Sequence, residues 1–297
     1  ANEGHTRAVL KIQEGCDRYC AYCIIPYVRG TVRSRPVADI TQEARKLGAQ
    51  GYLEAVLTGI HLTSYGRDLE GATLTDAVQA VADAPGIQRV RLGSLEPVIV
   101  DDAFAEALAA TGKVCPQFHL SLQSGSDTVL KRMRRRYTTA EYLDAVATLR
   151  KYFPGCAVTT DVITGFPGET DQEHEETLAF AQAVGFARMH VFPYSAREGT
   201  PAAAMPDQIP VPVREQRAKE VIALGQLSAQ AFKASTVGTV QSVLFEQEER
   251  DGARGYTGTY LEVFCPGAQP GEIHEVVITG VDGQRLTGTL SPPDKEV

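Results

Sequence analysis

Three closely spaced cysteines give this sequence its clearest capacity for chemistry. Cys16, Cys20 and Cys23 stand in the stretch "KIQEGCDRYCAYCIIPYVRG", and no fourth cysteine follows nearby. A structural zinc site is closed by four ligands, so zinc would also need a distant histidine. Thiolates equally hold iron–sulfur clusters, and three thiolates leave one iron of a 4Fe-4S cluster open. The spacing therefore predicts a metal site with one free position.

Length and composition are those of an ordinary globular chain. Its 297 residues suffice for one large domain and a small one, and 43% are hydrophobic and 22% charged. The other cysteines, Cys115, Cys156 and Cys265, are scattered, which favours buried thiols in a reducing compartment. No apolar run reaches the roughly 18 residues of a membrane span, and no apolar leader is evident. We therefore expect a cytoplasmic protein without a membrane partner.

The charge pattern contains two opposing signals. A net charge of −8 argues against a nucleic-acid partner, yet the stretch "LKRMRRRY" is strongly basic. Its basic residues are Lys131, Arg132, Arg134, Arg135 and Arg136, and Arg29, Arg33 and Arg35 follow the cysteines. A charge run is more often a solvated face than a binding surface, so a role in RNA binding requires that it lie beside the chemistry.

Short β-type runs alternate with helical segments over most of the chain. The runs are "AVLKIQ", "YLEAVLT", "IQRVRLG", "QFHLSLQ", "CAVTTDVIT" and "ARMHVFPY", and segments such as "LTDAVQAVADA" between them have helical apolar spacing. Strand–helix units in series predict a parallel sheet with right-handed crossovers. A closed barrel needs eight such units, so we expect a partial, open six-unit α/β barrel with a linking helix over residues 1–232.

The composition changes beyond this point. Residues 233–297 consist of short alternating stretches with glycine-rich turns and no helical period, which predicts a small all-β barrel. They contain five Lys or Arg residues and ten Asp or Glu residues. Such an acidic segment is a poor electrostatic match for a phosphate backbone.

The expected strand ends share a distinctive chemistry. They carry glycine or small hydroxyl residues, in the turns "LTGIHLTSYG", "GSLEP", "LQSGS", "DVITGFPGET" and "FPYSAREGTP". In a parallel barrel these turns meet at one face, where a ligand can approach the backbone closely. An open iron chelates the amino and carboxylate groups of an amino acid, and S-adenosylmethionine carries both. An electron from the cluster then splits its carbon–sulfur bond and releases a 5′-deoxyadenosyl radical.

The cysteine motif after the first strand of a partial barrel resembles the radical S-adenosylmethionine enzymes. More narrowly, "KIQEGCDRYCAYCIIPYVRG", "LQSGSDTVLKRMRR", "DVITGFPGET" and "HVFPYSAREGTPAA" are similar to the methylthiotransferases, and the final β segment resembles their TRAM domain. The turns "LTGIHLTSYG" and "GSLEP" look most like the MtaB type, which makes 2-methylthio-N6-threonylcarbamoyladenosine beside the tRNA anticodon. The resemblance covers nearly the whole chain.

The resemblance implies roles for individual positions but identifies no catalytic residue. Cys16, Cys20 and Cys23 would ligate the radical-generating cluster. The residues implied near S-adenosylmethionine are Tyr22 at the aromatic position between two cysteines, Thr58 and Gly59 near the amino group, Gln123 and Ser124 near the ribose, and Ile163 and Gly165 near the adenine. The superfamily usually has an acidic residue in the turn after the second strand. That acid is missing here, so Thr58 and Gly59 would act through backbone atoms or the hydroxyl.

The implied substrate is a tRNA anticodon stem-loop, and RNA-modifying enzymes commonly take an unstacked base into a pocket. Glu96, Asp161 and Tyr194 stand at expected strand ends and are candidates for lining that pocket. The basic residues from Lys131 to Arg136 follow the fourth strand, where they would hold phosphates beside it. His61 fits a supporting role near the site or a place in the core equally well.

The activity implied by the resemblance is methylthiolation of carbon 2 of the modified adenosine. S-adenosylmethionine would serve twice, once to methylate a sulfur on an auxiliary 4Fe-4S cluster and once to form the radical. In the family an N-terminal domain holds that second cluster, so we expect this chain to be the barrel and TRAM domain of a longer enzyme. An electron donor such as flavodoxin or ferredoxin would be a further partner.

Two alternatives remain at this point. Within the same family, the substrate can be another tRNA adenosine or an aspartate of a ribosomal protein. From another class, the chain can be a non-catalytic RNA-binding scaffold with a structural metal, in which case the protein would be colourless because zinc has a filled d shell.

Overall fold

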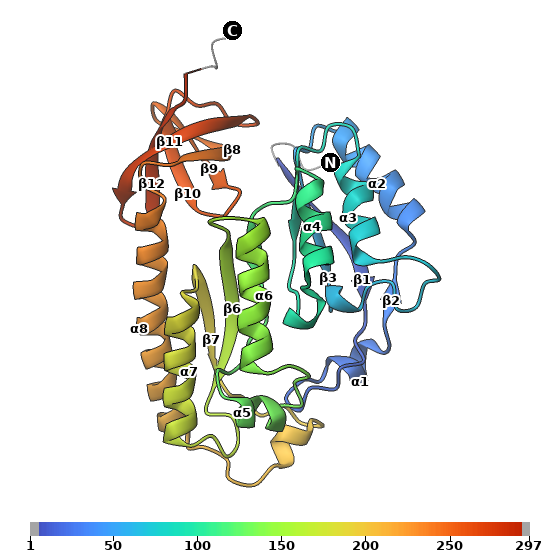
Figure 1. Cartoon of the computed structure of the whole chain (residues 1–297), viewed down its shortest axis with the longest axis vertical. Coiled ribbons are helices and arrows are strands. Elements are labelled where there is room, and N and C mark those ends of the chain that lie inside the picture. Colours follow the sequence, from blue (N-terminus) through green and yellow to red (C-terminus); the bar gives the residue numbers. More distant parts are fainter. Residues whose placement is uncertain (1–5, 293–297) are drawn as a thin grey trace.

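The computed structural model describes residues 6–292 as alternating strands and helices followed by a run of strands (Figure 1). The strands are β1 (Arg7–Glu14), β2 (Arg33–Ser34), β3 (Glu54–Gly59), β4 (Arg89–Leu92), β5 (Gln117–His119), β6 (Ala157–Thr164), β7 (Arg188–Pro193), β8 (Val240–Glu249), β9 (Gly252–Thr257), β10 (Glu262–Pro266), β11 (Ile273–Asp282) and β12 (Arg285–Leu290). The α-helices are α1 (Ile25–Arg29), α2 (Val37–Ala49), α3 (Leu74–Ala82), α4 (Asp102–Ala110), α5 (Asp127–Arg132), α6 (Thr139–Tyr152), α7 (Asp171–Val184) and α8 (Val211–Ser235). Short 3₁₀ helices are η1 (Leu62–Ser64), η2 (Pro97–Ile99) and η3 (Pro201–Ala204).

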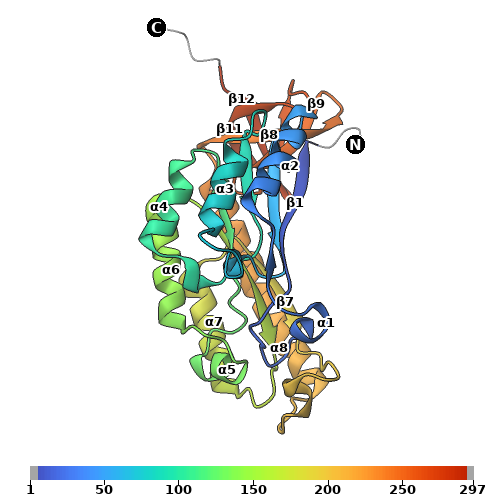
Figure 2. The same ribbon diagram turned by 90° about the vertical axis from the view of Figure 1, so that its right-hand side faces the viewer.

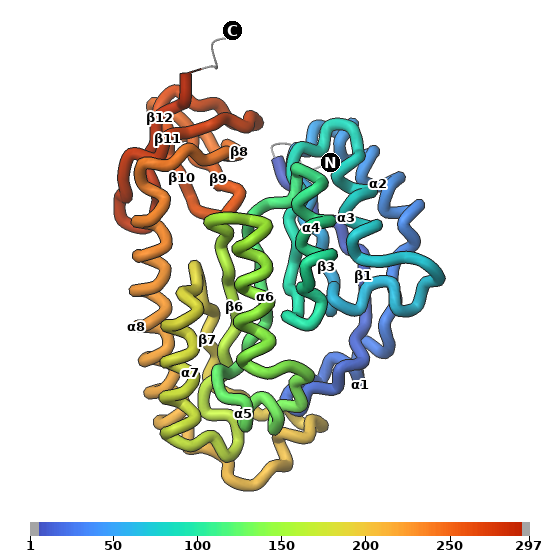
Figure 3. The backbone as a smooth tube through the Cα atoms, viewed as in Figure 1, coloured from blue at the N-terminus to red at the C-terminus, as the bar shows by residue number. Residues whose placement is uncertain are grey.

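Six parallel strands form a partial barrel. β1, β3 and β4 pair in that order, as do β5, β6 and β7. Parallel bridges from Val90 to Val114 and from Leu95 to Leu120 connect the two halves, so the strands follow one another in chain order. Within residues 6–292 no ladder joins β7 to β1, and the barrel is open on that side. The expected open six-unit barrel is confirmed, and the chain path is traced in Figure 3.

Helices cover the outer face of this curved sheet (Figure 2). Leu10, Leu57 and Val90 on the first three barrel strands are fully buried in one cluster with Val78 and Val81 of α3. Burial of such apolar side chains is the main source of stability for this layer. Helices α3, α6 and α7 each begin with a threonine capping box, which satisfies backbone N–H groups at their first turns.

The inner face of the sheet carries a group of polar side chains. Because side chains alternate along a strand, the buried Phe118 and Val162 face the helices while their neighbours face inward. Among these, His119 Nε2 lies 3.2 Å from Asp161 Oδ2, and the ring of His190 lies 6.1 Å from that of His119. All three polar side chains are partly exposed. The inside of the open barrel is therefore accessible to a polar ligand.

The last five strands close into a barrel in the order β10-β12-β11-β8-β9. Its core contains Val243, Phe245 and Val263, all fully buried, and the expected all-β barrel is confirmed. A Cβ at Gly255 would lie 2.0 Å from the Leu244 carbonyl oxygen, so only glycine permits this strand contact. The preceding helix α8 runs past the boundary expected after residue 232 and ends at Ser235.

The closed barrel packs against the amino-terminal ends of the parallel strands (Figure 1). Arg7, at the start of β1, forms a two-pronged ion pair with Glu246, with N–O distances of 2.7 and 2.8 Å. Arg89, at the start of β4, donates to Ser242 Oγ at 2.8 Å and to the Tyr256 carbonyl at 3.1 Å. The carboxyl-terminal ends of the strands, where the cysteines lie, are at the opposite end of the partial barrel.

Candidate functional site

The cysteine loop follows β1 and is fixed by its backbone. Gly15 begins it with φ +71°, and a Cβ there would lie 1.9 Å from the Thr31 carbonyl oxygen. Ala21, at its centre, donates its N–H to the Met133 carbonyl at 2.9 Å and accepts from the Ala202 N–H at 2.8 Å. The loop is thereby tied to the segment after α5 and to η3. These contacts span the open side of the barrel at the end where the strands finish.

The loop offers three thiols as possible metal ligands. Cys16 and Cys20 are buried and Cys23 is partly exposed. Burial raises the pKa of the Cys16 and Cys23 thiols, with the nearby cysteines adding to the effect. Among the described residues, no three His, Cys, Asp or Glu side chains converge closely enough for one metal ion. A 4Fe-4S cluster takes one thiolate per iron, and an all-thiolate set is the chemistry it prefers.

A buried carboxylate lies beside this loop. Glu96 follows β4 and is 4% exposed. Arg18, from within the cysteine loop, and Arg135, after α5, each place a nitrogen 2.9 Å from its oxygens, and His61 Nε2 lies at 3.2 Å. Burial alone would raise the pKa of the Glu96 carboxyl, but the contact with His61 and the charges of Arg135 and Arg18 lower it to about 2. Glu96 is therefore ionised and carries a fixed negative charge.

Buried polar atoms without an aligned hydrogen-bond partner collect at this end of the barrel. Between residues 6 and 292 they are Arg18 Nε, His61 Nε2, Glu96 Oε2, Arg132 Nε, Arg135 Nη2 and Tyr194 Oη. All follow the carboxyl-terminal end of a parallel strand. Several lie close to an opposite charge without the alignment of a hydrogen bond. Because such atoms are costly to bury, the grouping of Arg18, His61 and Arg135 around Glu96 indicates a site that a ligand completes.

The residues expected near the methionine part of the cofactor lie close to this carboxylate. Gly59 ends β3, and a Cβ there would lie 2.8 Å from Gln13 Oε1. The same oxygen accepts the His61 N–H at 2.7 Å. Thr58 precedes this turn and is partly exposed on the inner face. Tyr22 packs against an apolar cluster that contains Phe166 and Tyr194.

The residues expected near the nucleoside lie after β5 or around the end of β6. Gln123, with φ +72°, and Ile163 are joined by a hydrogen bond from the Ile163 N–H to the Gln123 carbonyl at 2.9 Å. Ser124 is fully buried, and its hydroxyl lies 3.2 Å from Thr177 Oγ1. A Cβ at Gly165 would lie 2.4 Å from Arg214 Cγ. Ser124 and Gly165 therefore contact the helices, and only their backbone shapes the inner face.

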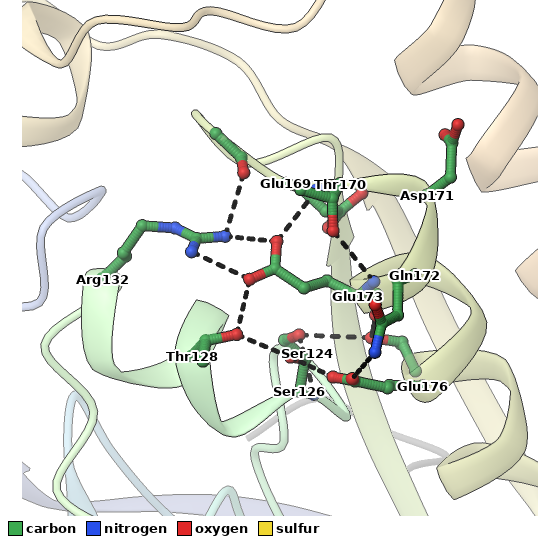
Figure 4. Close-up of polar contacts among 12 residues, drawn as sticks. Ser124, Ser126, Thr128, Arg132, Glu169, Thr170, Asp171, Gln172, Glu173 and Glu176 are labelled. Atoms are coloured by element: carbon green, nitrogen blue, oxygen red, sulfur yellow. Dashed lines mark hydrogen bonds and ion pairs between the residues drawn. The ribbon is translucent and has the colours of Figure 1, made fainter.

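The basic run after β5 does not form one patch. Lys131, Arg134 and Arg136 are exposed, whereas Arg132 and Arg135 are not. Figure 4 shows the Arg132 fork paired with Glu173, at 2.6 and 2.9 Å, with Thr128 Oγ1 donating to the same carboxylate. Arg135 is turned inward, with its side chain 6% exposed. The phosphate-binding role expected for the whole run is open only to the exposed members.

Arg18, Gln13 and Tyr137 are site residues that the sequence reasoning did not single out. Arg18 lies between two cysteines of the motif, and this position alone would have indicated that it is near the site. Gln13 is buried and donates to the Gly15 carbonyl at 2.7 Å, which holds the start of the loop. Tyr137 holds Arg135 with a hydrogen bond of 3.0 Å. Nothing in their spacing distinguishes Gln13 or Tyr137 from ordinary core residues. Cys115, Cys156 and Cys265 are free and buried, as expected.

The sequence profile of the Radical SAM superfamily matches residues 10–181, more than half of the chain. The chain belongs to this superfamily. It is 41% identical over 270 residues to the threonylcarbamoyladenosine tRNA methylthiotransferase MtaB of Bacillus subtilis, covering 89% of this chain and 60% of that protein. It is 38% identical over 289 residues to the tRNA-2-methylthio-N(6)-dimethylallyladenosine synthase of Clostridium botulinum, covering 95% and 64%. The chain thus spans less than two thirds of the length of these relatives.

Among solved structures, the radical SAM enzyme coproporphyrinogen III oxidase (HemN) from Escherichia coli resembles this chain in fold. The TM-score is 0.53 at 15% identity, and the match covers 86% of this chain and 66% of HemN. At this identity the likeness concerns the fold alone. No helix in the described part of the chain combines the length and apolar composition needed to cross a membrane.

Proposed function

We propose that this chain is the cluster-binding and nucleoside-binding part of a tRNA methylthiotransferase, acting on carbon 2 of N6-threonylcarbamoyladenosine next to the anticodon. The observation that carries the proposal is the cysteine loop beside a buried, incompletely bonded set of charged groups, Arg18, Glu96 and Arg135. This set lies where the strands of a radical SAM barrel end. The relative with the higher identity of the two compared acts on threonylcarbamoyladenosine, which supports this substrate.

Cys16, Cys20 and Cys23 would hold a 4Fe-4S cluster with one open iron. When bound, the cluster supplies the electron that cleaves S-adenosylmethionine to a 5′-deoxyadenosyl radical. The protein's own contribution is to bind and orient. Glu96 offers an ionised carboxylate for a cationic group beside the loop, and the bonded backbones of Gln123 and Ile163 form a rigid edge for a flat nucleoside.

The primary test is anaerobic reconstitution of the chain with iron and sulfide. About four irons per chain, broad absorption near 400 nm and release of 5′-deoxyadenosine with a strong reductant are expected. Cys23→Ala should abolish the cluster and the cleavage, whereas Cys265→Ala, a buried thiol of the C-terminal barrel, should change neither. A colourless protein that binds one zinc ion would instead support the scaffold alternative.

The substrate assignment needs its own experiment. Nucleosides of tRNA from a strain lacking the gene should contain N6-threonylcarbamoyladenosine without its methylthio group. Intact 2-methylthio-N6-threonylcarbamoyladenosine in that strain would contradict the proposal. Loss of the methylthio group from dimethylallyladenosine, or from a ribosomal protein aspartate, would identify the other substrates of the family.

The proposed partners are the tRNA anticodon stem-loop and an electron donor such as flavodoxin or ferredoxin, in the cytoplasm. Exposed Lys131, Arg134 and Arg136 support an RNA contact because they lie at the same end of the barrel as the cysteines. The acidic C-terminal barrel packs at the other end. Reversing the charge of Arg134 and Arg136 together should weaken tRNA binding and reduce its salt dependence. An unchanged tRNA affinity with an unchanged salt dependence would show that these residues do not contact the RNA.

A further inference from the structure

Arg135 connects a cysteine of the loop to the buried carboxylate. Its Nη1 lies 3.2 Å from the Cys20 sulfur, and its Nη2 lies 2.9 Å from Glu96 Oε1. Its Nε donates to the Tyr137 hydroxyl at 3.0 Å, and the guanidinium carbon lies 4.9 Å from the centre of that ring. Each guanidinium nitrogen therefore has a different neighbour. A lysine ammonium would not reach all three, because it is a point charge without a planar fork.

The surrounding backbone holds Arg135 in this position. The Tyr137 hydroxyl contacts the Ser121 and Leu122 carbonyls beyond β5, at 2.5 and 2.8 Å. The preceding residue, Arg134, has φ +59°, a left-handed conformation that costs free energy for a residue other than glycine. This conformation turns the chain after α5 back towards the cysteine loop. Such strain is retained where the surrounding contacts require a particular direction of the side chain.

We propose that Arg135 is a positioning residue that raises the reduction potential of the cluster held by Cys16, Cys20 and Cys23. The inference rests on the cluster of the proposed function. A guanidinium N–H directed at a ligating sulfur stabilises negative charge on it, and hydrogen bonds to the sulfurs are a principal determinant of cluster potentials. The reduced cluster carries one electron more than the oxidised cluster. Arg135 therefore favours uptake of that electron, without itself gaining or losing a proton.

Glu96 opposes this effect in the same network. Its ionised carboxylate lies against Arg135 and also against Arg18, whose Nη2 is 2.9 Å away. The negative charge offsets part of the field that the two arginines exert on the sulfurs. Removing Arg135 and removing the charge of Glu96 should therefore shift the potential in opposite directions. A purely structural role for either residue predicts no such opposition of sign.

The test is a potentiometric titration of the reconstituted chain, followed by electron paramagnetic resonance of the reduced cluster, with titanium(III) citrate as the reductant. Arg135→Met should lower the ratio of reduced to oxidised cluster about tenfold at a fixed potential, which is a midpoint about 59 mV more negative. Arg135→Lys keeps the charge but not the planar fork, so its midpoint potential should fall between those of the wild type and Arg135→Met. Glu96→Gln should move the midpoint in the positive direction.

Arg132→Met is the matched control. Arg132 also forms an ion pair with the buried Glu173, but among the described residues it forms no hydrogen bond with a cysteine. Its loss should lower the free energy of unfolding and leave the midpoint unchanged. Iron is measured in every variant before titration.

The outcomes separate the two levels of the argument. A wild-type chain that binds no cluster contradicts the proposed function itself. Full iron content with unchanged midpoints in both Arg135→Met and Glu96→Gln overturns the inference while the proposed function stands. Where Arg135→Met fails to bind iron, Glu96→Gln decides alone: a positive shift supports the network, and an unchanged or negative shift overturns it.

Discussion

Two buried arginine–glutamate clusters lie at opposite ends of the open barrel and differ in how completely they are bonded. At the amino-terminal ends of the strands, Arg91 pairs with Glu54 at 2.7 Å and donates to two carbonyls of the C-terminal barrel. At the carboxyl-terminal ends, Glu96 lies between Arg18 and Arg135, and all three residues retain a buried atom without an aligned partner. The same residue types thus serve in two different ways.

The difference distinguishes charged side chains that stabilise the fold from charged side chains at the proposed ligand site. A saturated cluster joins two parts of the chain, and any loss of a partner leaves an uncompensated charge. An unsaturated cluster is a poor device for stability because its unpaired atoms are costly in a low-dielectric interior. Its retention beside the cysteine loop is explained if cofactor or substrate supplies the missing partners. Variants at the two ends can therefore contradict or refine this comparison.

The largest expected effect is on stability at the amino-terminal end. Glu54 is 1% exposed and carries the only carboxylate that Arg91 contacts in the described chain. Glu54→Gln should lower the free energy of unfolding by about 3–5 kcal/mol, because Arg91 is left as a buried unpaired charge. Urea unfolding followed by circular dichroism measures this. A loss below about 1 kcal/mol would show that this cluster is not the structural one.

A somewhat smaller effect concerns the pH dependence of stability at the other end. The pKa of Glu96 is about 2 in the folded chain against 4.5 for an ordinary glutamate. A lowered folded pKa contributes stability above pH 4.5, and this is lost as the pH falls from 4.5 towards 2, in total about 3 kcal/mol. Glu173, whose pKa is also lowered to about 2, titrates in the same window. The stability difference between wild type and Glu96→Gln should therefore shrink on acidification, and a constant difference would contradict the assignment.

The barrel was predictable from the sequence, whereas the charged network of the site was not. Apolar spacing identified the six strands and the helices because burial imposes a period of two or 3.6 residues. The amino-acid sequence does not reveal the direction of side chains at the end of a short helix. Arg132, Arg134 and Arg135 read as one basic run, but successive residues point to different sides, and the left-handed Arg134 then turns Arg135 inward.

Contacts between residues far apart in the chain account for most of what sequence reasoning missed. The motif predicts Cys16, Cys20 and Cys23 as cluster ligands because local spacing alone defines such a loop. Glu96 was recognised as a strand-end residue, yet its pairing with Arg18 joins positions that only the curvature of the sheet brings together. Ser124 was expected near the ribose, but the fold directs its hydroxyl to Thr177 of α7. The family resemblance therefore predicts which positions lie near the site, whereas the packing of the fold determines which of their atoms point into it.

A third prediction tests whether the incompletely bonded group of Arg18, Glu96 and Arg135 serves catalysis. Glu96→Gln should retain its iron but release 5′-deoxyadenosine about 10–100-fold more slowly, as is usual for residues that orient metal-site groups. Glu54→Gln, assayed below its unfolding transition, should release 5′-deoxyadenosine at the wild-type rate. Its ion pair with Arg91 lies at the amino-terminal ends of the strands, far from the cysteine loop. Equal losses in the two variants would mean that the two ends are not functionally distinct.

The smallest expected effect refines the structural role of the C-terminal barrel. The Tyr260 ring stacks on Tyr256 at 4.9 Å and lies 4.8 and 5.1 Å from the guanidinium carbons of Arg91 and Arg7. Tyr260 has φ +67°, which asparagine tolerates, so Tyr260→Asn removes the ring with little backbone penalty. Loss of these cation–π contacts should cost about 1 kcal/mol of unfolding free energy, because the ring is partly exposed. The cluster midpoint and the cleavage rate should stay at wild-type values. A shift in either would show that the closed barrel influences the site through the strands, and the division between a structural and a functional end would then have to be abandoned.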